Sequence, residues 1–348
     1  MACEVPKTLD RALDPAWLSE ALAPVTGGAR VTAVKQVELL RTVATKVRFT
    51  AVFEGARGGA EAFCLKAFLD MEGTGLNAGS TSIRESDFYI EVAPKLSVRT
   101  ADCVATVIDR EGGSAAFIMR DLKAAGAHFC TALEAFDANR AAASLEQLAR
   151  LHASHATPAS LGAIPWLISQ IASLADSTYF TPQSLQGLLD GPRGEGLTAR
   201  TRSAEVLLQA LRALAARDAE LPHVLIHGDC HAGNIFETSE GAGLIDWQLL
   251  QHGSWSLDIA YHINAILGVE MAEREERALL GYYLETVRRL GGVAPDPEEA
   301  WRLYRMAVVY GYFLWAITRR VEPAITNTFV NRLGLAVERH DSYRLLGL

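Results

Sequence analysis

The amino-terminal third of the chain alternates apolar and polar residues in short runs, a pattern typical of strands with one buried face. The strand-like runs are 30–39, 45–53, 60–68, 102–108 and 115–119. Glycines within 55–59 predict a turn between the second and third runs. A glycine-rich stretch at 73–80 leads to a helical period at 82–93, which we expect Pro94 to end. The pattern therefore predicts a β-rich amino lobe over residues 1–120.

The remainder of the chain has a different period. Apolar residues recur every three or four positions, which indicates helices with one buried face. These segments are 137–156, 198–219, 272–291 and 297–318, with another near the carboxyl terminus. A strand, a polar loop and a second strand occupy 223–246. We expect an α+β, bilobal fold in which a mainly helical carboxyl lobe covers residues 121–348.

The composition excludes several classes of protein. Lys and Arg number 33 against 41 Asp and Glu, giving a net charge of -8, so a general nucleic-acid or anionic-membrane binder is not expected. A local basic pocket for nucleotide phosphates remains compatible with this balance. Five cysteines without a CxxC spacing argue against a disulfide framework or a zinc site. Neither the polar amino terminus nor the longest apolar run, 307–317, resembles a targeting or membrane segment, so we expect a soluble, cytoplasmic protein.

The most informative segment is VLIHGDCHAGNIF at 224–236, which GLIDWQ follows at 243–248. Apolar strands flank a loop that carries Asp229 and Asn234, and Asp246 ends the next apolar run. Phosphoryl transfer needs such a set, because one carboxylate orients the attacking hydroxyl while hard oxygen ligands hold Mg²⁺ on the nucleotide. The alternative is an ordinary turn in which Asp and Asn bond the local backbone. A catalytic loop is favoured over an ordinary turn, because HGD, the flanking strands and the downstream IDW occur together.

These motifs resemble the aminoglycoside phosphotransferase and choline kinase-like superfamily, and most closely its ecdysteroid-kinase-like branch. The shared pattern is HGDxxxxN, then IDF or IDW, then an apolar helix with an aspartate, here HGDCHAGN, IDWQ and SWSLDIAYHI. The resemblance implies a protein-kinase-like fold that uses ATP and Mg²⁺. It implies that Asp229 is the catalytic base, that Asn234 and Asp246 are metal ligands, and that His227 and Asp258 support the loop structurally. Asp258 alone could equally be a helix amino-terminal acid.

A kinase fold also requires a strand lysine that a helix glutamate holds against the nucleotide phosphates. Lys66 lies in the apolar strand AFCLKAF, where it is either an edge-strand charge or the phosphate-binding lysine. Helical periodicity places Glu85 on a buried side with Tyr89, Val92 and Leu96. It places the competing Glu91 on a solvated side with Arg84, Asp87 and Lys95. We therefore expect Glu85 to pair with Lys66.

Two nucleotide contacts are harder to assign. The phosphate-covering hairpin of many kinases is glycine-rich, but its expected position here, 39–49, contains no glycine. Thr42, Thr45 and nearby amides remain candidates for a phosphate cap. After the fifth strand, AFIMRDL falls where the family has its hinge, and the backbone around Met119 and Asp121 is expected to pair with adenine. His152 lies on a leucine-rich helical face and is expected to be a core histidine.

The expected function is therefore ATP-dependent phosphorylation of a hydroxyl group on a small, largely apolar molecule. Two alternatives are an antibiotic-modifying phosphotransferase and an inactive nucleotide-binding protein of the same fold, although neither Asp229 nor Asp246 is lost. The aromatic segment 301–320 is either a buried helix or one wall of an acceptor pocket with Arg319 or Arg320 at its mouth. The sequence does not specify the acceptor, because one fold serves many substrates.

Overall fold

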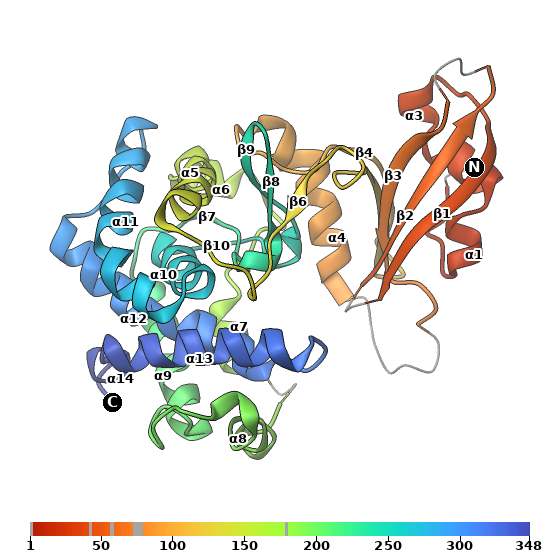
Figure 1. Cartoon of the computed structure of the whole chain (residues 1–348). Helices are drawn as coiled ribbons and strands as arrows, with labels where there is room; N and C mark the ends of the chain where they lie inside the picture. The colour runs from red at the N-terminus through yellow and green to blue at the C-terminus, as the bar shows by residue number, and fades with distance from the viewer. Residues whose placement is uncertain (1–2, 42–43, 56–58, 72–78, 178–179) are drawn as a thin grey trace. The chain divides into compact units, whose positions relative to one another are not determined.

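A computed structural model describes residues 3–41, 44–55, 59–71, 79–177 and 180–348, and the chain divides into two compact units (Figure 1). Unit 1 comprises Met1–Lys95, Thr100–His128 and Trp247–Leu249. Unit 2 comprises Leu96–Arg99, Phe129–Asp246 and Leu250–Leu348. Unit 1 is built on a five-stranded antiparallel sheet and unit 2 is mainly helical, so the expected α+β class is confirmed.

The sheet of unit 1 has the strand order β1-β2-β3-β5-β4. Its strands are β1 (Val31–Arg41), β2 (Thr45–Phe53), β3 (Glu61–Ala67), β4 (Cys103–Asp109) and β5 (Ser114–Arg120), and each pairs antiparallel with its neighbours. In β2 the buried residues alternate strictly, as the sequence pattern predicted. Residues 56–58 of the expected turn and most of the glycine-rich stretch lie outside the described residues.

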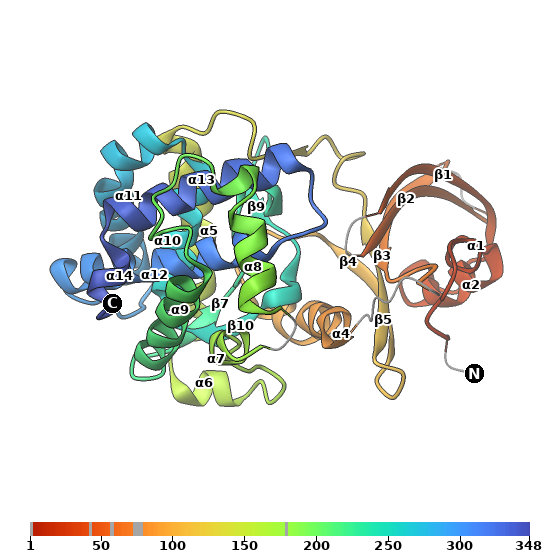
Figure 2. The same ribbon diagram turned by 90° about the horizontal axis from the view of Figure 1, so that it is seen from below.

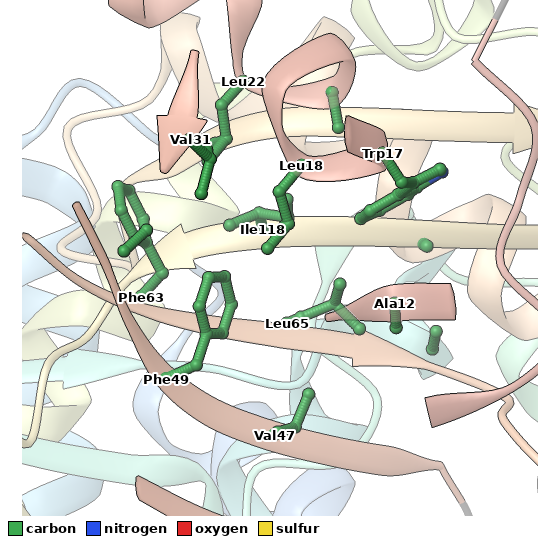
Figure 3. Close-up of a cluster of buried hydrophobic side chains, with 14 of the residues drawn as sticks. Ala12, Trp17, Leu18, Leu22, Val31, Val47, Phe49, Phe63, Leu65 and Ile118 are labelled. Atoms are coloured by element: carbon green, nitrogen blue, oxygen red, sulfur yellow. The ribbon is translucent and has the colours of Figure 1, made fainter. Parts of the chain in front are cut away.

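The amino-terminal helices cover one face of this sheet. They are α1 (Leu9–Ala12), α2 (Pro15–Ala21) and α3 (Ala23–Thr26). The side chains of Thr8 and Asp14 cap the first turns of α1 and α2, respectively. Figure 3 shows Trp17 and Leu18 facing Leu65 and Ile118 of the sheet. Each large side chain buried in this way contributes about 1.5–3 kcal/mol. The sequence analysis did not predict these helices, because each is too short to show a period.

The opposite face of the sheet carries α4 (Gly79–Asp87), which continues as a π-helical turn at Phe88–Val92 and a 3-10 turn at Ala93–Lys95 (Figure 2). Pro94 therefore lies inside the last turn instead of ending the helix. The π turn contains an extra residue, so a fixed period of 100° per residue fails beyond Phe88. Arg84 and Asp87, which we expected on a solvated side, are buried. They bond the Gln248 carbonyl and the Arg110 guanidinium, respectively.

Unit 2 surrounds one central helix, α10 (Trp255–Ile266), in which every residue is buried. Helices α5 (Ala138–Ser154), α11 (Val269–Arg289), α12 (Pro297–Ile317) and α13 (Pro323–Arg339) pack against it. The remaining helices are α6 (Pro158–Gly162), α7 (Ile171–Ala175), α8 (Pro182–Leu189), α9 (Ala204–Asp218) and α14 (Ser342–Leu345). The short strands β7 (Val224–Ile226) and β10 (Gln251–Gly253) pair with each other, as do β8 (Ile235–Thr238) and β9 (Gly241–Leu244).

The division between the units differs from the expected boundary after residue 120. Unit 1 extends to His128 because the segment after β5 is bonded to the sheet: the Asp121 amide donates to Ala62, and its carboxylate accepts from Arg48 at 2.9 Å. Residues 247–249 also belong to unit 1, since Trp247 stacks on Phe88 with ring centroids 4.0 Å apart. Contacts between residues distant in the sequence, which periodicity does not reveal, therefore set this boundary.

Candidate active site

The loop that follows β7 is held by a buried carboxylate from α10. Asp258 is fully buried and accepts hydrogen bonds from the backbone amides of His227 at 2.7 Å and Gly228 at 2.9 Å. Gly228 has φ 80°, a left-handed conformation that favours glycine. Burial acts to raise the pKa of Asp258, but hydrogen bonding and charge from His152 outweigh it, and the pKa is lowered overall. Asp258 is therefore ionised when it braces the loop.

Two histidines complete this support. His152, buried as expected, lies 3.1 Å from Asp258 Oδ2 through Nε2 and 2.7 Å from the Tyr283 hydroxyl through Nδ1. The sequence analysis placed His152 in the core but did not detect this contact. His227 Nδ1 accepts from the Asp229 amide, and its Nε2 donates to the Ile245 carbonyl at 3.0 Å. Burial lowers the pKa of His227, which keeps the ring neutral and suited to these opposite roles.

The Asp229 carboxylate projects from the loop into a partly accessible position. The Tyr261 hydroxyl donates to its Oδ1 at 3.1 Å. Burial, together with the negative charge of Asp246, raises the pKa of Asp229 to about 6. A carboxylate with such a pKa is a stronger proton acceptor than an ordinary surface aspartate, which suits a general base.

Three further residues lie beside Asp229, and none of them was predicted from the sequence as part of the site. Tyr261 accepts a hydrogen bond from Trp315 Nε1 at 2.6 Å, so α12 holds Tyr261 and Tyr261 holds Asp229. His231 Nδ1 accepts from the Gly233 amide at 3.0 Å, which leaves its Nε2 3.8 Å from Asp229 Oδ1. The His231 ring also contacts Trp315, with centroids 5.0 Å apart. HGDCHAGN does contain His231, but no local pattern links Tyr261 or Trp315 to the loop.

Asn234 and Asp246 offer the oxygen atoms that a magnesium ion requires. Asn234 is buried, and its Nδ2 donates to the Asp229 carbonyl at 2.7 Å, so Oδ1 is the amide atom left for a cation. The backbone joins the two segments, because the Ile245 amide donates to the Asn234 carbonyl at 3.0 Å. Asp246 has φ 67°, unusual for a residue other than glycine and most often seen at functional or turn positions. One amide oxygen and a carboxylate fit Mg²⁺, which keeps several waters.

Unit 1 contains the lysine and glutamate that the sequence paired. Lys66 Nζ lies 2.6 Å from Glu85 Oε2, and both side chains are buried. Strand alternation explains the placement, because Leu65 and Ala67 join the core under the amino-terminal helices while Lys66 points to the α4 face. The other Glu85 oxygen accepts from the Trp247 amide at 3.3 Å. Buried in this way, the ion pair is fixed in one geometry.

The other residues expected to contact the nucleotide belong to the phosphate-covering hairpin and to the hinge after β5. Thr42 lies outside the described residues, whereas Thr45 is buried at the start of β2 and pairs in register with Ala67. Met119 lies within β5, opposite Cys64 and Cys103 of the neighbouring strands. The Asp121 amide donates to Ala62 and its carbonyl accepts from Ala125. The amide is thus occupied, but a carbonyl oxygen has a second lone pair, so adenine pairing by the backbone around Met119 and Asp121 stays a prediction.

The aromatic segment 301–320 forms α12, and most of its rings are buried in unit 2, including Tyr304, Tyr310, Tyr312 and Phe313. Tyr310 donates to the Gly228 carbonyl at 2.8 Å and so supports the loop. The helix ends at Ile317, and Arg319 is exposed with a contact to Ser184 at 3.3 Å. The helix is therefore buried over most of its length, although Trp315 lies beside the Asp229 loop, and nothing here supports a pocket mouth at Arg319.

The fold and these residues define the class of protein-kinase-like phosphotransferases. Residues 82–293 match the model of the phosphotransferase enzyme family, and the chain belongs to that family. A methylthioribose kinase of Bacillus cereus is 36% identical over 62 residues, which span 18% of this chain and 16% of the kinase.

Solved structures with low sequence identity share the fold. An ethanolamine kinase of Plasmodium vivax has a TM-score of 0.54 at 10% identity, covering 89% of this chain and 82% of that one. The choline kinase LicA of Streptococcus pneumoniae, in complex with AMP, has a TM-score of 0.50 at 15% identity, covering 90% and 94%. At these identities the likeness establishes the fold alone. Among the helices of the described ranges, none is both long and apolar enough to cross a bilayer.

Proposed function

We propose that this protein transfers the γ-phosphoryl group of Mg·ATP to a hydroxyl group of a small molecule. The observation that carries the proposal is Asp229, a carboxylate of raised pKa that Tyr261 orients on a loop braced by Asp258. Asp229 accepts the acceptor's proton as the hydroxyl oxygen bonds to phosphorus and the bond to the ADP oxygen breaks. The AMP-bound choline kinase of the same fold supports an adenine nucleotide as donor.

The remaining residues bind and orient the nucleotide in this proposal. Asn234 Oδ1 and the Asp246 carboxylate would hold Mg²⁺, which would supply positive charge against the phosphates. Lys66, fixed by Glu85, binds the α- and β-phosphates. Thr45 stays a candidate for contact with a nucleotide phosphate, in the segment 39–49 that contains no glycine.

The finer proposal is that the acceptor is largely apolar. Its support is the surroundings of Asp229, where His231 contacts the Trp315 and Phe329 rings instead of a cluster of carboxylates. A polycationic antibiotic would need acidic partners there. A parallel assay of aminoglycosides against hydroxylated aromatic, steroid and hydroxyacyl compounds tests this point. Efficient turnover of aminoglycosides alone would reject the apolar acceptor and leave the kinase reaction intact.

The reaction itself is tested with two variants and a chelator. A screen of hydroxylated metabolites for ADP release identifies an acceptor, and excess EDTA should then abolish turnover. Asp229→Asn should keep Mg·ATP binding in calorimetry but lose about 10²–10⁴-fold in kcat, the usual effect of removing a general base. Asp246→Ala should instead lose Mg·ATP binding. Loss of nucleotide binding in Asp229→Asn, or full turnover in EDTA, would contradict these roles.

A further inference from the structure

Unit 2 contains a cleft formed by residues that take no part in the proposed reaction. It has a volume of about 530 Å³, within the range of small-molecule sites. Helix α6 with the segment up to Leu167 forms one side, and the loop after α9 forms the other, with side chains such as Leu161, Ile164 and Leu221. All of the lining residues are apolar or glycine except His223 and His252, and none carries a carboxylate.

The two histidines are hydrogen-bonded to each other and lie beside a buried acid, Asp218. His223 Nδ1 lies 2.8 Å from His252 Nδ1. His223 Nε2 lies 3.0 Å from both the carbonyl and Oδ2 of Asp218. Asp218 is buried at the carboxyl end of α9, and its Oδ1 accepts from the Ser254 amide. The described residues give His252 Nε2 no hydrogen-bond partner, so it is the free nitrogen of the pair.

Counting protons along this pair shows what His252 offers to the cleft. His223 Nε2–H donates to the Asp218 carbonyl, so in the neutral pair His223 Nδ1 accepts from His252 Nδ1–H. His252 Nε2 then carries no hydrogen and can only accept a hydrogen bond. One added proton reverses the central hydrogen bond: His223 Nδ1–H donates, and the His252 proton resides on Nε2. The free nitrogen thereby changes from acceptor to donor.

The surroundings favour the protonated pair. The Asp218 carboxylate and the carbonyl end of α9 both stabilise a positive charge on His223. The hydrogen bond to Asp218 accordingly raises the pKa of His223, whereas burial and the charge of His223 lower the pKa of His252. The added proton is therefore bound by His223, and the pair presents a charge-assisted N–H donor at His252.

We propose that this cleft is a second binding site, for a small apolar carboxylate whose hydrocarbon part lies among Leu161, Ile164 and Leu221 and whose carboxylate accepts a hydrogen bond from His252 Nε2. Hydrogen-bond complementarity selects this class, because the protonated pair presents an N–H donor that a carboxylate accepts, whereas a protonated amine offers only donors. A single donor suits a carboxylate better than a phosphate, which needs several donors. The site goes beyond the proposed phosphotransfer and does not depend on it.

Calorimetry with hexanoate tests the proposal on the full chain, and hexanamide serves as the neutral analogue of similar shape. Hexanoate should bind at least about tenfold more tightly at about pH 6 than at about pH 8, because the pair must carry the proton. At about pH 8, where the pair takes up its proton on binding, the binding heat should differ between phosphate and Tris buffers in proportion to the proton taken up. Hexanamide should show neither effect. Equal buffer heats, or no binding at millimolar hexanoate, would overturn the proposal.

Variants locate the site. His252→Leu keeps the apolar lining and should weaken hexanoate binding about tenfold or more, whereas His128→Leu, the same change at an exposed histidine of unit 1, should not. His223→Gln should abolish proton uptake. Hexanoate binding that is unchanged in His252→Leu would reject the cleft as its site. The melting temperature of each variant verifies folding, and the two-buffer comparison on the unaltered chain stands even if a variant fails to fold.

Discussion

At the scale of single residues, the Asp229 carboxylate is subject to opposing influences. Burial and the charge of Asp246 raise its pKa, while His227 and the Tyr261 hydroxyl act to lower it. The balance leaves a carboxylate that is ionised near neutral pH yet basic enough to accept a proton. Tyr261 also fixes the direction of the carboxylate, since its hydroxyl is itself held by Trp315.

Tyr261→Phe tests this arrangement. The variant loses a hydrogen bond to an ionised group and should lower kcat about tenfold or more, with the KM for ATP unchanged. Tyr312→Phe is the matched control, because it removes a buried hydroxyl that donates to the Thr201 carbonyl. Both variants should lose some thermal stability, but only Tyr261→Phe should lose kcat. Equal kcat values in the two variants would limit Tyr261 to a structural role.

The Lys66–Glu85 pair leads to a separate residue-scale prediction. Glu85→Gln removes the charge that holds Lys66 at 2.6 Å and should raise the KM for ATP about tenfold. Glu91→Gln lies in the following π turn, away from this ion pair, and should leave the KM for ATP unchanged. Steady-state kinetics at saturating acceptor measure both. If the two substitutions are equally harmless, Glu85 does not position the lysine for nucleotide.

At the scale of elements, α10 and α12 must approach closely for Tyr261 to reach Asp229. Gly311 of α12 permits this approach, because a Cβ built there would lie 2.5 Å from Tyr261 Cδ2. Side chains in protein cores occupy nearly all the available volume, so such an overlap has to be relieved by movement. The glycine thus controls the position of a tyrosine that lies fifty residues earlier in the chain.

Gly311→Ala should therefore lower the free energy of unfolding by about 1–3 kcal/mol and also lower kcat, because the displaced Tyr261 ring no longer orients Asp229. Gly281→Ala is a matched control in α11, where a Cβ meets nothing within 4 Å. That substitution should raise the free energy of unfolding by about 1 kcal/mol and leave kcat unchanged. Urea unfolding and turnover assays on both variants measure these effects. A stable, fully active Gly311→Ala variant would contradict the role of this contact.

At the scale of the whole molecule, the helices of unit 2 meet at a buried polar centre as well as an apolar core. Glu276 of α11 accepts from Arg339 Nη2 at 2.9 Å, from the Tyr304 hydroxyl at 3.2 Å, and lies 3.0 Å from His340 Nε2. Arg339 also donates to Asn264 Oδ1 of α10. One carboxylate therefore links several helices, and its removal would leave buried donors unsatisfied.

This centre predicts a pH dependence of stability. Burial acts to raise the pKa of Glu276, but hydrogen bonds from His340 and Arg339 outweigh it and lower the pKa overall. A carboxylate with a folded-state pKa below its unfolded value stabilises the fold above the unfolded pKa, and this stabilisation disappears as the pH falls through the folded value. Glu276→Gln should therefore cost about 3 kcal/mol near neutral pH and much less in acid.

Urea unfolding of Glu276→Gln across the acid range measures the effect, with Glu273→Gln at an exposed position of the same helix as the control. The control should be nearly neutral at every pH. A constant difference between the Glu276 variant and the unaltered chain from neutral pH to strong acid would show that the charge of Glu276 does not stabilise the fold.

The sequence by itself determined features that depend on local periodicity or local motifs. The bounds of β2, the long helices and the Lys66–Glu85 pairing all follow from which residues share one face of an element. HGDCHAGN and IDWQ also indicate directly the loop that we propose to be catalytic, because phosphoryl transfer requires those residue types close together.

Only the tertiary structure decided the environment of those residues. The raised pKa of Asp229, the chain from Trp315 through Tyr261, and the brace from His152 to Asp258 arise from side chains distant in sequence. Periodicity also failed for Arg84 and Asp87, because a polar side chain is buried when a remote partner bonds it. Charge burial and hydrogen-bond pairing depend on three-dimensional neighbours, and no local pattern specifies those neighbours.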